Sequence, residues 1–451
     1  MTDYAHLWNK VDQRIIEALG PDVWIVGGAV RDCIMGRTAN DVDLATKWTP
    51  DLVGERATAT GLSVIETGIE HGTVTVTDGT NRWEITTLRK DISCDGRNAT
   101  VEFGCDIEDD LARRDFTVNA MAVDVNGELI DPFGGCHDCG FSLIRCVGEP
   151  VDRFNEDLLR VLRLHRLQAT LGGVIERDTA IAMREIAPRF CQEIGGIVSV
   201  ERVVQEFNRA FEAERCEGFL GGCWRISIIQ TILPEFIGAD GLMQSPTHHP
   251  EGDVWTHTKQ VVDRCPTAHR WHALLHDIGK VEAAEPHLDY NKFPAHESVG
   301  AKMIPAIGER LKWPTKLTDS VALTTKYHMQ AYQLMLAKDW SGTPKRRFQN
   351  RVLTAGGREG LDAVLAVLRA DHPSLPDDFV AELGEVTEVV QPILMGRHLI
   401  DVIAPGPLMG RLLKAALDYQ LEQGTTSLDV LREYALSGKV IADAVARERN
   451  P

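Results

Sequence analysis

The feature that most constrains the fold is a change of pattern near residue 150. Before it, short β-rich runs alternate with turn signals, for example Val23–Val26, Asp41–Ala45 and Arg82–Leu88. After it, apolar residues recur at helical spacing, beginning with Asn155–Leu171. Strands followed by helices, rather than alternating with them, predict the α+β class. We therefore expect a small mixed sheet flanked by helices, followed by an all-helical remainder.

The chain of 451 residues has room for about three domains. Changes in composition place boundaries near residues 150, 245 and 380, and the Pro-, His- and Gly-rich segment Ser245–Gly252 is typical of a linker. The expected parts are a sheet-containing head (1–150), a helical neck and body (151–245), a second helical domain (246–380) and a helical tail (381–451).

The charge balance narrows the class of partner. The chain carries 48 Lys and Arg against 66 Asp and Glu, a formal charge of −18. An overall negative field repels phosphate, which disfavours a nonspecific nucleic-acid coat but allows selective binding through a local basic groove. No apolar run approaches the roughly 20 residues of a membrane span, and the first residues lack a signal-peptide pattern. We expect a cytoplasmic protein with no membrane partner; no pattern indicates an oligomeric state.

The cysteines fit a reducing compartment. They are spread thinly between Cys33 and Cys265 rather than spaced as a disulfide framework. Cys136-His-Asp-Cys139 has metal-like spacing, but no second pair follows at zinc-site distance. We interpret it as a reduced loop.

A glycine turn and three carboxylates mark a candidate phosphate and metal site in the head. Gly27-Gly28 ends a strand and opens a helix, where backbone N–H groups favour a phosphate. On a strand Asp41 and Asp43 share one face, so that they could hold Mg²⁺, and Glu84 on a later strand could be a third carboxylate. Each motif alone is also typical of a simple turn or a solvated strand end.

Arginines in the head suit a triphosphate. Arg31 follows the glycines, and Arg113-Arg114-Asp115 precede an expected strand, Phe116–Met121. Guanidinium groups bind phosphate oxygens bidentately. Two metals would activate an attacking hydroxyl and neutralise a leaving pyrophosphate.

Several motifs in this order resemble the class II tRNA nucleotidyltransferases, which comprise the CCA-adding enzymes and bacterial poly(A) polymerases. The motifs are Gly27-Gly-Ala-Val-Arg-Asp32, Asp41-Val-Asp43, Arg113-Arg-Asp-Phe-Thr-Val-Asn-Ala-Met-Ala122, Asp131-Pro-Phe-Gly-Gly135 and Glu156-Asp-Leu-Leu-Arg-Val-Leu-Arg163. The resemblance implies a polymerase-β-like head in which Asp41 and Asp43 bind Mg²⁺. The nucleotide-binding candidates are Gly27, Gly28, Arg31, Arg113, Arg114, Asn119, Asp157, Arg160, Arg163 and Arg166.

Asp157 and Arg160, three residues apart on the expected helix, form an acceptor beside a donor fork. Cytosine and adenine each present an amino donor beside a ring-nitrogen acceptor, whereas uracil and guanine present a carbonyl oxygen that a carboxylate repels. The resemblance implies that this pair selects the base, with Arg163 and Arg166 as further nucleotide contacts. Intrahelical ion pairing, such as Glu156 with Arg160, is the alternative explanation of the spacing.

A second set of residues predicts another metal centre. His257 precedes Trp271-His-Ala-Leu-Leu-His-Asp-Ile-Gly-Lys280, an ordering that resembles HD-domain phosphohydrolases. Mixed nitrogen and oxygen ligands suit a divalent transition metal (Ni, Mn, Co or Fe) that activates water. The ligand candidates are His257, His276, Asp277 and Asp371, and His296 and His328 are candidates for a second metal or a phosphate. The alternative is an inert helical domain that helps to hold tRNA.

The function that we expect is template-independent addition of CMP and AMP, from CTP and ATP, to the 3′ end of tRNA. Within the family, addition of A alone or poly(A) synthesis is the alternative. A hypothesis from a different functional class is that the chain is an HD phosphohydrolase whose head binds nucleotide or RNA without catalysis.

Overall fold

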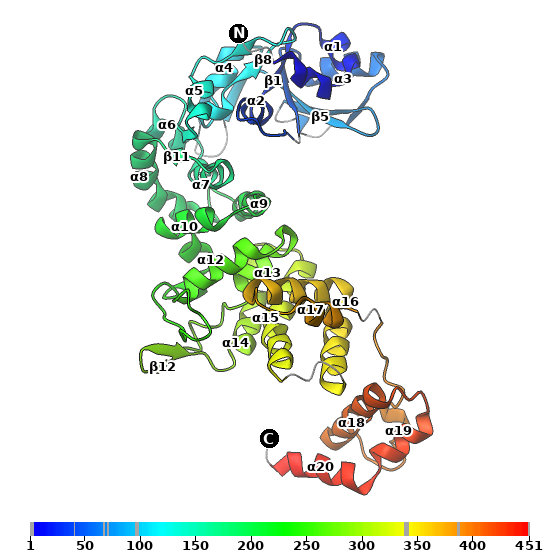
Figure 1. Cartoon of the computed structure of the whole chain (residues 1–451). Coiled ribbons are helices and arrows are strands. Elements are labelled where there is room, and N and C mark those ends of the chain that lie inside the picture. Colours follow the sequence, from blue (N-terminus) through cyan, green and yellow to red (C-terminus); the bar gives the residue numbers. More distant parts are fainter. Residues whose placement is uncertain are drawn as a thin grey trace. The chain divides into compact units, whose positions relative to one another are not determined.

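The computed structural model describes residues 4–449 except 40, 66–67, 70–71, 95–98, 338–341 and 386–387. The chain forms two compact units, Met1–Ile232 and Leu233–Pro451 (Figure 1). No helix among the described residues is long and apolar enough to cross a membrane.

A seven-stranded mixed sheet forms the centre of the first unit. In spatial order its strands are β3 (Ser63–Ile65), β4 (Thr73–Thr77), β5 (Arg82–Thr87), β2 (Asp43–Thr46), β1 (Val23–Val26), β8 (Ala122–Val123) and β9 (Leu129–Ile130). The strands β2 and β5 are parallel and the other pairs are antiparallel. All four residues of β1 are buried, because both of its neighbours are strands and apolar groups cover its faces.

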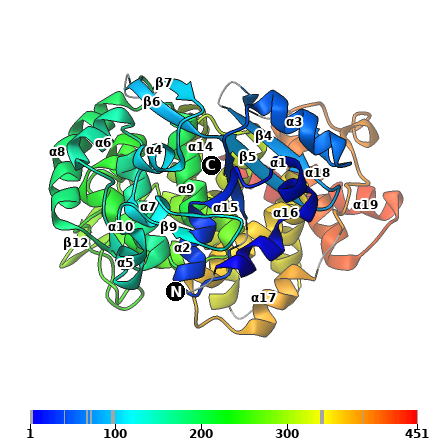
Figure 2. The same cartoon turned by 90° about the horizontal axis from the view of Figure 1, so that it is seen from above.

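Helices and small sheets surround this sheet. The helices are η1 (Ala5–Lys10), α1 (Gln13–Leu19), α2 (Gly28–Ile34), α3 (Pro50–Ala59), α4 (Ile107–Ala112), η3 (Thr117–Asn119) and α5 (Gly135–Gly140). Figure 2 shows α3 beside β4, with which it makes contacts. The strands β6 (Arg89–Cys94) and β7 (Ala99–Phe103) form a separate hairpin, and β10 (Leu143–Ile144) pairs in parallel with β11 (Val174–Ile175). The turn-rich part of the loop expected after residue 89, at Asp95-Gly96 and Asn98, lies outside the described residues.

The first unit continues into helices. They are α6 (Pro150–Glu156), α7 (Arg160–Leu171), α8 (Arg177–Glu193), α9 (Val200–Phe211), α10 (Glu217–Arg225) and α11 (Ile228–Ile232). Side-chain oxygens begin two of them: Glu176 accepts from Asp178 N–H and Thr179 N–H, and Ser199 accepts from Arg202 N–H. The helix α7 buries its apolar residues against α9 and α10.

Among its described residues, the second unit is helical apart from one hairpin. Its helices are η4 (Pro234–Phe236), α12 (Val254–Arg264), η5 (Thr267–His269), α13 (Arg270–Leu275), α14 (His296–Arg310), α15 (Thr315–Leu336), α16 (Thr343–Asp371), α17 (Asp377–Gly384), η6 (Gly396–His398), α18 (Pro407–Gln423), α19 (Leu428–Ala435) and α20 (Gly438–Arg449). One core lies between α15, α16 and α17 around Phe348 and Phe379, and another around Leu412 and Leu431 of the last helices. The hairpin, β12 (Glu285–His287) and β13 (Tyr290–Lys292), was not expected from the helical spacing.

The predicted α+β class is confirmed, but two element predictions are wrong. The expected strand Phe116–Met121 contains the 3₁₀ turn η3, because the Asp115 carboxylate accepts from Phe116 N–H and from the Asn119 amide and so competes with strand pairing. The expected helix Asn155–Leu171 is interrupted at Asp157, which is extended (φ −148°, ψ 103°) and whose Oδ1 accepts from Leu159 N–H at 3.1 Å.

Candidate active sites

The turn between β1 and α2 brings an arginine against the backbone. Gly27 has φ +71°, and a Cβ at this position would lie 2.9 Å from Nη1 of Arg114. Only glycine allows this close approach without strain. The N-terminus of α2 and the Arg114 guanidinium therefore lie together.

The three carboxylates predicted in the head lie close together, at or just before the start of β2 and on the neighbouring strand β5. Leu44 of β2 pairs with Ile85 of β5 in parallel, so Asp43 and Glu84, one residue earlier in each strand, are neighbours on one face. Asp41 precedes the strand, which begins at Asp43 rather than at residue 41 as expected. Although Asp43 keeps contact with solvent, surrounding protein atoms desolvate its carboxylate and raise its pKa; Glu84 and Asp41 add repulsion, and Arg114 offsets part of it. This concentration of negative charge is the donor set that Mg²⁺ prefers.

A buried carboxylate holds the two adjacent arginines. Oδ1 of Asp110 lies 2.6 Å from Nη2 of Arg113, and Oδ2 lies 3.1 Å from Nη2 of Arg114. Burial raises the pKa of Asp110, but the two guanidinium groups outweigh this effect and lower it. Asp110 thus orients both arginines beside the glycine turn.

A second chain of contacts joins the other head candidates to α7. Nη1 of Arg31 donates to the Asn119 side-chain oxygen at 2.7 Å, and the Asn119 amide donates to buried Asp115 at 3.3 Å. Asp115 also pairs with Arg163, at 2.6 Å. Gly28 lies against Arg31, whose Nη2 would be 3.5 Å from an added Cβ.

Asp157 and Arg160 do not lie on one continuous helix as expected, because the helix is interrupted at Asp157. Oδ2 of Asp157 accepts from Arg202 of α9 at 2.7 Å. Arg160 pairs with Glu156 at 2.7 Å and donates to the Arg113 carbonyl at 3.0 Å. The ion pair of Glu156 with Arg160 is therefore present, as the alternative explanation of the spacing required.

Arg166 is held apart from this cluster by another buried acid. Its Nε lies 2.6 Å from Oε2 of Glu206, which also pairs with Arg209. The sequence indicated Arg166 but not its partner, which lies 40 residues away on α9. The acids Asp110 and Glu206 and the cation Arg202 were likewise missed, since their only signal was proximity to arginine motifs.

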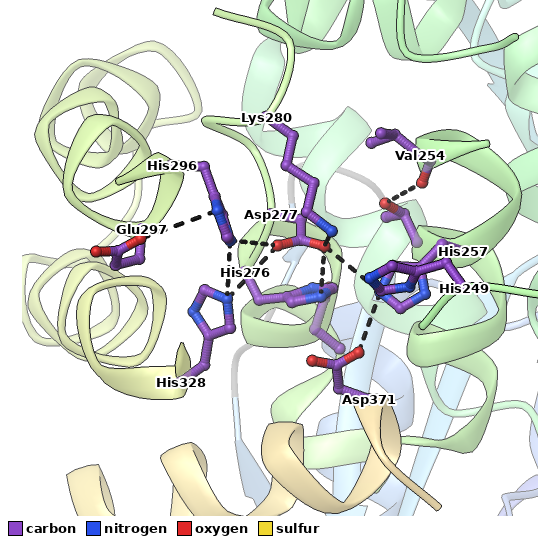
Figure 3. Close-up of polar contacts among 12 residues, drawn as sticks. His249, Val254, His257, His276, Asp277, Lys280, His296, Glu297, His328 and Asp371 are labelled. Atoms are coloured by element: carbon purple, nitrogen blue, oxygen red, sulfur yellow. Dashed lines mark hydrogen bonds and ion pairs between the residues drawn. The ribbon is translucent and has the colours of Figure 1, made fainter. Parts of the chain in front are cut away.

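The second unit brings all six predicted metal-ligand candidates together. Figure 3 shows them converging from α12, the end of α13, α14, α15 and the end of α16. Nε2 of His257 lies 3.1 Å from Asp371 Oδ1 and 3.4 Å from Asp277 Oδ2, and Nε2 of His276 lies 3.1 Å from the same Asp277 oxygen. Oδ1 of Asp277 faces Nε2 of His296 at 3.1 Å and Nε2 of His328 at 3.5 Å. One carboxylate thus lies between two groups of imidazoles.

The chemistry of these atoms fits a divalent cation. Nε2 of His257 and of His276 and Oδ1 of Asp371 are buried and face one another without well-directed hydrogen bonds, and Asp277 Oδ2 faces them while it pairs with Lys280 at 2.6 Å. Burial lowers the pKa of His257, but Asp277, Asp371 and Glu251 outweigh this effect and raise it to about 10, so the centre attracts positive charge. Three groups of possible ligands result: His257, His276 and Asp371 in one, Asp277, His296 and His328 in the second, and His249, Glu251 and His257 in the third.

Several residues of this centre were missed by sequence reasoning. Buried Lys280 lies 2.6 Å from Asp277 Oδ2 and donates to the Gln244 side-chain oxygen at 2.6 Å. His249 and Glu251 lie beside His257, with Glu251 Oε1 2.5 Å from its Nδ1. The motif ending in Lys280 and the polar segment around residue 250 were visible, but the segment was interpreted as a linker.

Comparisons with known proteins address both units. The family model for the poly(A) polymerase head domain matches residues 23–145, and the HD domain model matches residues 264–361. A multifunctional CCA protein of Halorhodospira halophila is 34% identical over 326 residues, which cover 69% of this chain and 74% of that protein. The chain belongs to the CCA-adding enzyme family.

Two further relatives illustrate this membership. A CCA-adding enzyme of Streptococcus gordonii is 42% identical over 43% of this chain, and the match spans 47% of that relative's length. The crystal structure of the Bacillus stearothermophilus CCA-adding enzyme in complex with CTP matches with a TM-score of 0.65 at 25% identity and covers 99% of both chains. The polymerase-β-like head and helical body are therefore the family fold. Two of the ligand candidates, His257 and Asp371, lie outside the residues that the HD model matches.

Proposed function

We propose that this member of the CCA-adding enzyme family adds CMP and AMP, from CTP and ATP, to the 3′ end of tRNA without a nucleic-acid template. The observation that carries the proposal is the position of Asp41, Asp43 and Glu84 beside Arg114 and the glycine turn. Phosphoryl transfer needs this combination of metal-binding carboxylates and phosphate-binding cations.

In this proposal each group of the head has a separate task. Asp41 and Asp43 hold Mg²⁺, with Glu84 as a third carboxylate, and Gly27 lets the triphosphate approach the backbone. Bound Mg²⁺ supplies activation of the terminal ribose hydroxyl and charge neutralisation at the leaving pyrophosphate. Arg31, Arg113 and Arg114, with Gly28 and Asn119 around them, orient the triphosphate. Asp110 and Asp115 keep these side chains in place.

Asp157 and Arg160 select the base, and Arg163 and Arg166 make further contacts with the nucleotide. The Asp157 carboxylate accepts from Leu159 N–H and from Arg202, and each of its oxygens retains a second lone pair for the amino group of cytosine or adenine. Arg160 is engaged with Glu156 and must turn part of its donor fork towards the base. Binding of the nucleotide therefore exchanges internal ion pairs for contacts with the ligand.

The test offers purified protein three tRNAs, ending before CCA, after C and after CC, with CTP or ATP separately. We expect CTP to extend the first two and ATP the third. Extension of the CC-ended tRNA alone indicates an A-adding enzyme, and long A tracts indicate a poly(A) polymerase. No extension of any substrate contradicts the proposal.

We propose a second activity, metal-dependent hydrolysis of phosphoesters at the HD centre, because buried imidazole nitrogens and carboxylate oxygens converge there. His257, His276, Asp277 and Asp371 would hold one divalent transition metal (Ni, Mn, Co or Fe), and His296 and His328 with Asp277 a second metal or the phosphate. A metal at this site supplies an activated water. Damaged tRNA ends that carry a phosphate or a cyclic phosphate are the substrates that this chemistry suits.

The HD proposal has its own test. The double variant His276→Ala, Asp277→Ala should lose hydrolysis of a 3′-phosphate or 2′,3′-cyclic phosphate and retain nucleotide addition. Absence of both bound metal and hydrolysis in the unmodified protein would leave the second unit as a helical domain that helps to hold tRNA.

A further inference from the structure

His257 differs from the three other histidines of the HD centre in what holds its outer nitrogen. Nδ1 of His276, His296 and His328 lies 2.7–2.9 Å from the carbonyl oxygen three residues earlier, in Ala273, Phe293 and Thr325 respectively. A carbonyl can only accept, so each of these Nδ1 atoms carries the proton and leaves Nε2 free for a metal. Nδ1 of His257 instead faces a carboxylate, Oε1 of Glu251, at 2.5 Å.

Glu251 is presented by a segment that closes on itself. Gln244 N–H donates to the Gly252 carbonyl at 3.0 Å, and Met243 bridges to Asp253, whose carboxylate caps α12 through Thr256 N–H. This closed turn, 243–253, ends where α12 begins, one helical turn before His257. The polar segment interpreted as a linker therefore lies against the HD centre.

We propose that Glu251 is a positioning residue for metal binding by His257. When a metal displaces the proton of Nε2, this carboxylate accepts the hydrogen bond from Nδ1 of His257, fixes the plane of the ring and increases the basicity of the ligand nitrogen. The inference rests on the proposed metal binding at this centre. It extends the site to a residue outside the range that the HD model matches.

The charges of the centre support this assignment. Asp277, Asp371 and Glu251 contribute three negative charges and Lys280 one positive charge, while the imidazole ligands are neutral when they bind a metal. The net charge of −2 balances one divalent cation. Without Glu251 the balance would be −1, and the cation would carry an uncompensated charge in a buried site.

Glu297 supplies a matched control. Its carboxylate lies 3.9 Å from Nδ1 of another proposed ligand, His296, but that nitrogen already donates to the Phe293 carbonyl at 2.9 Å. Both glutamates are thus close to a ligand imidazole, at side-chain exposures of 14% for Glu251 and 27% for Glu297. They differ in whether they accept its proton.

The experiment titrates Ni²⁺ into metal-free full-length protein by calorimetry. All proteins carry Asp41→Asn and Asp43→Asn, so that the carboxylates of the head do not contribute. We expect Glu251→Gln and Glu251→Ala to weaken Ni²⁺ binding about 10- to 100-fold, and Glu297→Gln to leave it unchanged. With diamagnetic Zn²⁺ in place of Ni²⁺, the nitrogen NMR shifts of His257 in the parent should show the proton on Nδ1 and the metal on Nε2, and Glu251→Gln should change the shift of Nδ1.

The outcomes separate the two proposals. If the parent protein binds no Ni²⁺, the proposed metal centre itself is wrong. If the parent binds Ni²⁺ and both Glu251 variants bind it as tightly as Glu297→Gln does, the positioning role is wrong. Nucleotide addition by Glu251→Gln in the otherwise unmodified chain checks that the variant folds.

Discussion

The two candidate sites satisfy their charged groups in opposite ways. In the head, Arg31, Arg113, Arg114 and Arg163 already have protein acceptors, and buried Asp110 and Asp115 supply most of them. In the HD centre, buried imidazole nitrogens and carboxylate oxygens face one another, with Lys280 as the cation beside them. In the proposed functions, the head exchanges internal partners for a nucleotide, whereas the HD centre exchanges protons for a cation. A site for a changing nucleotide benefits from the first arrangement, and a site for a resident metal from the second.

The largest effect should come from replacing a carboxylate of the proposed Mg²⁺ site in the head. Asp43→Asn keeps the side-chain size but removes a metal-binding charge, and nucleotide addition should fall by about 10⁴-fold, since metal stabilisation of the transferring phosphate contributes several kcal/mol. Single-turnover incorporation of labelled CMP measures this loss. Asp51→Asn, which changes an exposed carboxylate on α3, is the control. Full activity of Asp43→Asn would remove Asp43 from the metal site.

The second-largest effect should come from removing the buried carboxylate that pairs with Arg113 and Arg114 in the head. Asp110→Asn leaves Arg113 and Arg114 without their buried counter-charge and should lower the free energy of unfolding by about 3 kcal/mol at pH 7. The pKa of Asp110 is lowered in the folded protein, so its stabilisation is complete above the unfolded pKa of about 4 and is lost as the pH falls through the folded value. Urea unfolding at pH 7 and at acidic pH measures the difference.

The matched control for this prediction is Lys316→Gln, which breaks an exposed ion pair with Glu359 and should cost less than about 1 kcal/mol. The difference in free energy of unfolding between Asp110→Asn and the unmodified protein should decrease as the pH falls. A difference that stays the same at acidic pH would show that Asp110 acts through packing rather than through its charge.

The smallest effect concerns the ion pair that holds Asp157 in position for the nucleotide base. Arg202→Gln removes the guanidinium that holds Oδ2 of Asp157, while the bond from Leu159 N–H to Oδ1 remains. We expect about a tenfold loss in the preference for CTP over UTP, equivalent to one hydrogen bond to a charged group. Relative incorporation of the two nucleotides measures it, with Arg215→Gln, whose side chain is 75% exposed, as control. An unchanged preference would mean that Arg202 only packs α9 against the rest of the unit.

The sequence was informative where the two-residue repeat of a strand, or two functional residues adjacent in the chain, marks the site. The sequence indicated Asp43 and Glu84 on two strands, and the parallel register of β2 and β5, which the sequence did not predict, makes them neighbours. Asp41 precedes β2 rather than sharing the strand with Asp43 as expected. The adjacent pair His276-Asp277 indicated the HD centre, and all six of its candidates come together in the structure. In each case the residues that carry the chemistry also define the motif.

It failed where side chains determine the backbone or where partners are distant in sequence. The break at Asp157 depends on a carboxylate that caps the following turn, and helical spacing contains no sign of it. The turn η3 has the same cause at Asp115. Glu206 and Glu251 lack a periodic signal, because Glu206 contacts Arg166 and Glu251 contacts His257 from another element of the chain.

The most direct measurement of the central claim is sequencing of the product made from tRNA that lacks its 3′ end, with CTP and ATP both present. We expect the unmodified protein to add C, C and A and then to stop, and the variant Asp41→Asn with Asp43→Asn to add nothing. We also expect the His276→Ala, Asp277→Ala variant to give the same product as the unmodified protein. Tracts of A, or equal activity of the Asp41 and Asp43 double variant, would contradict it.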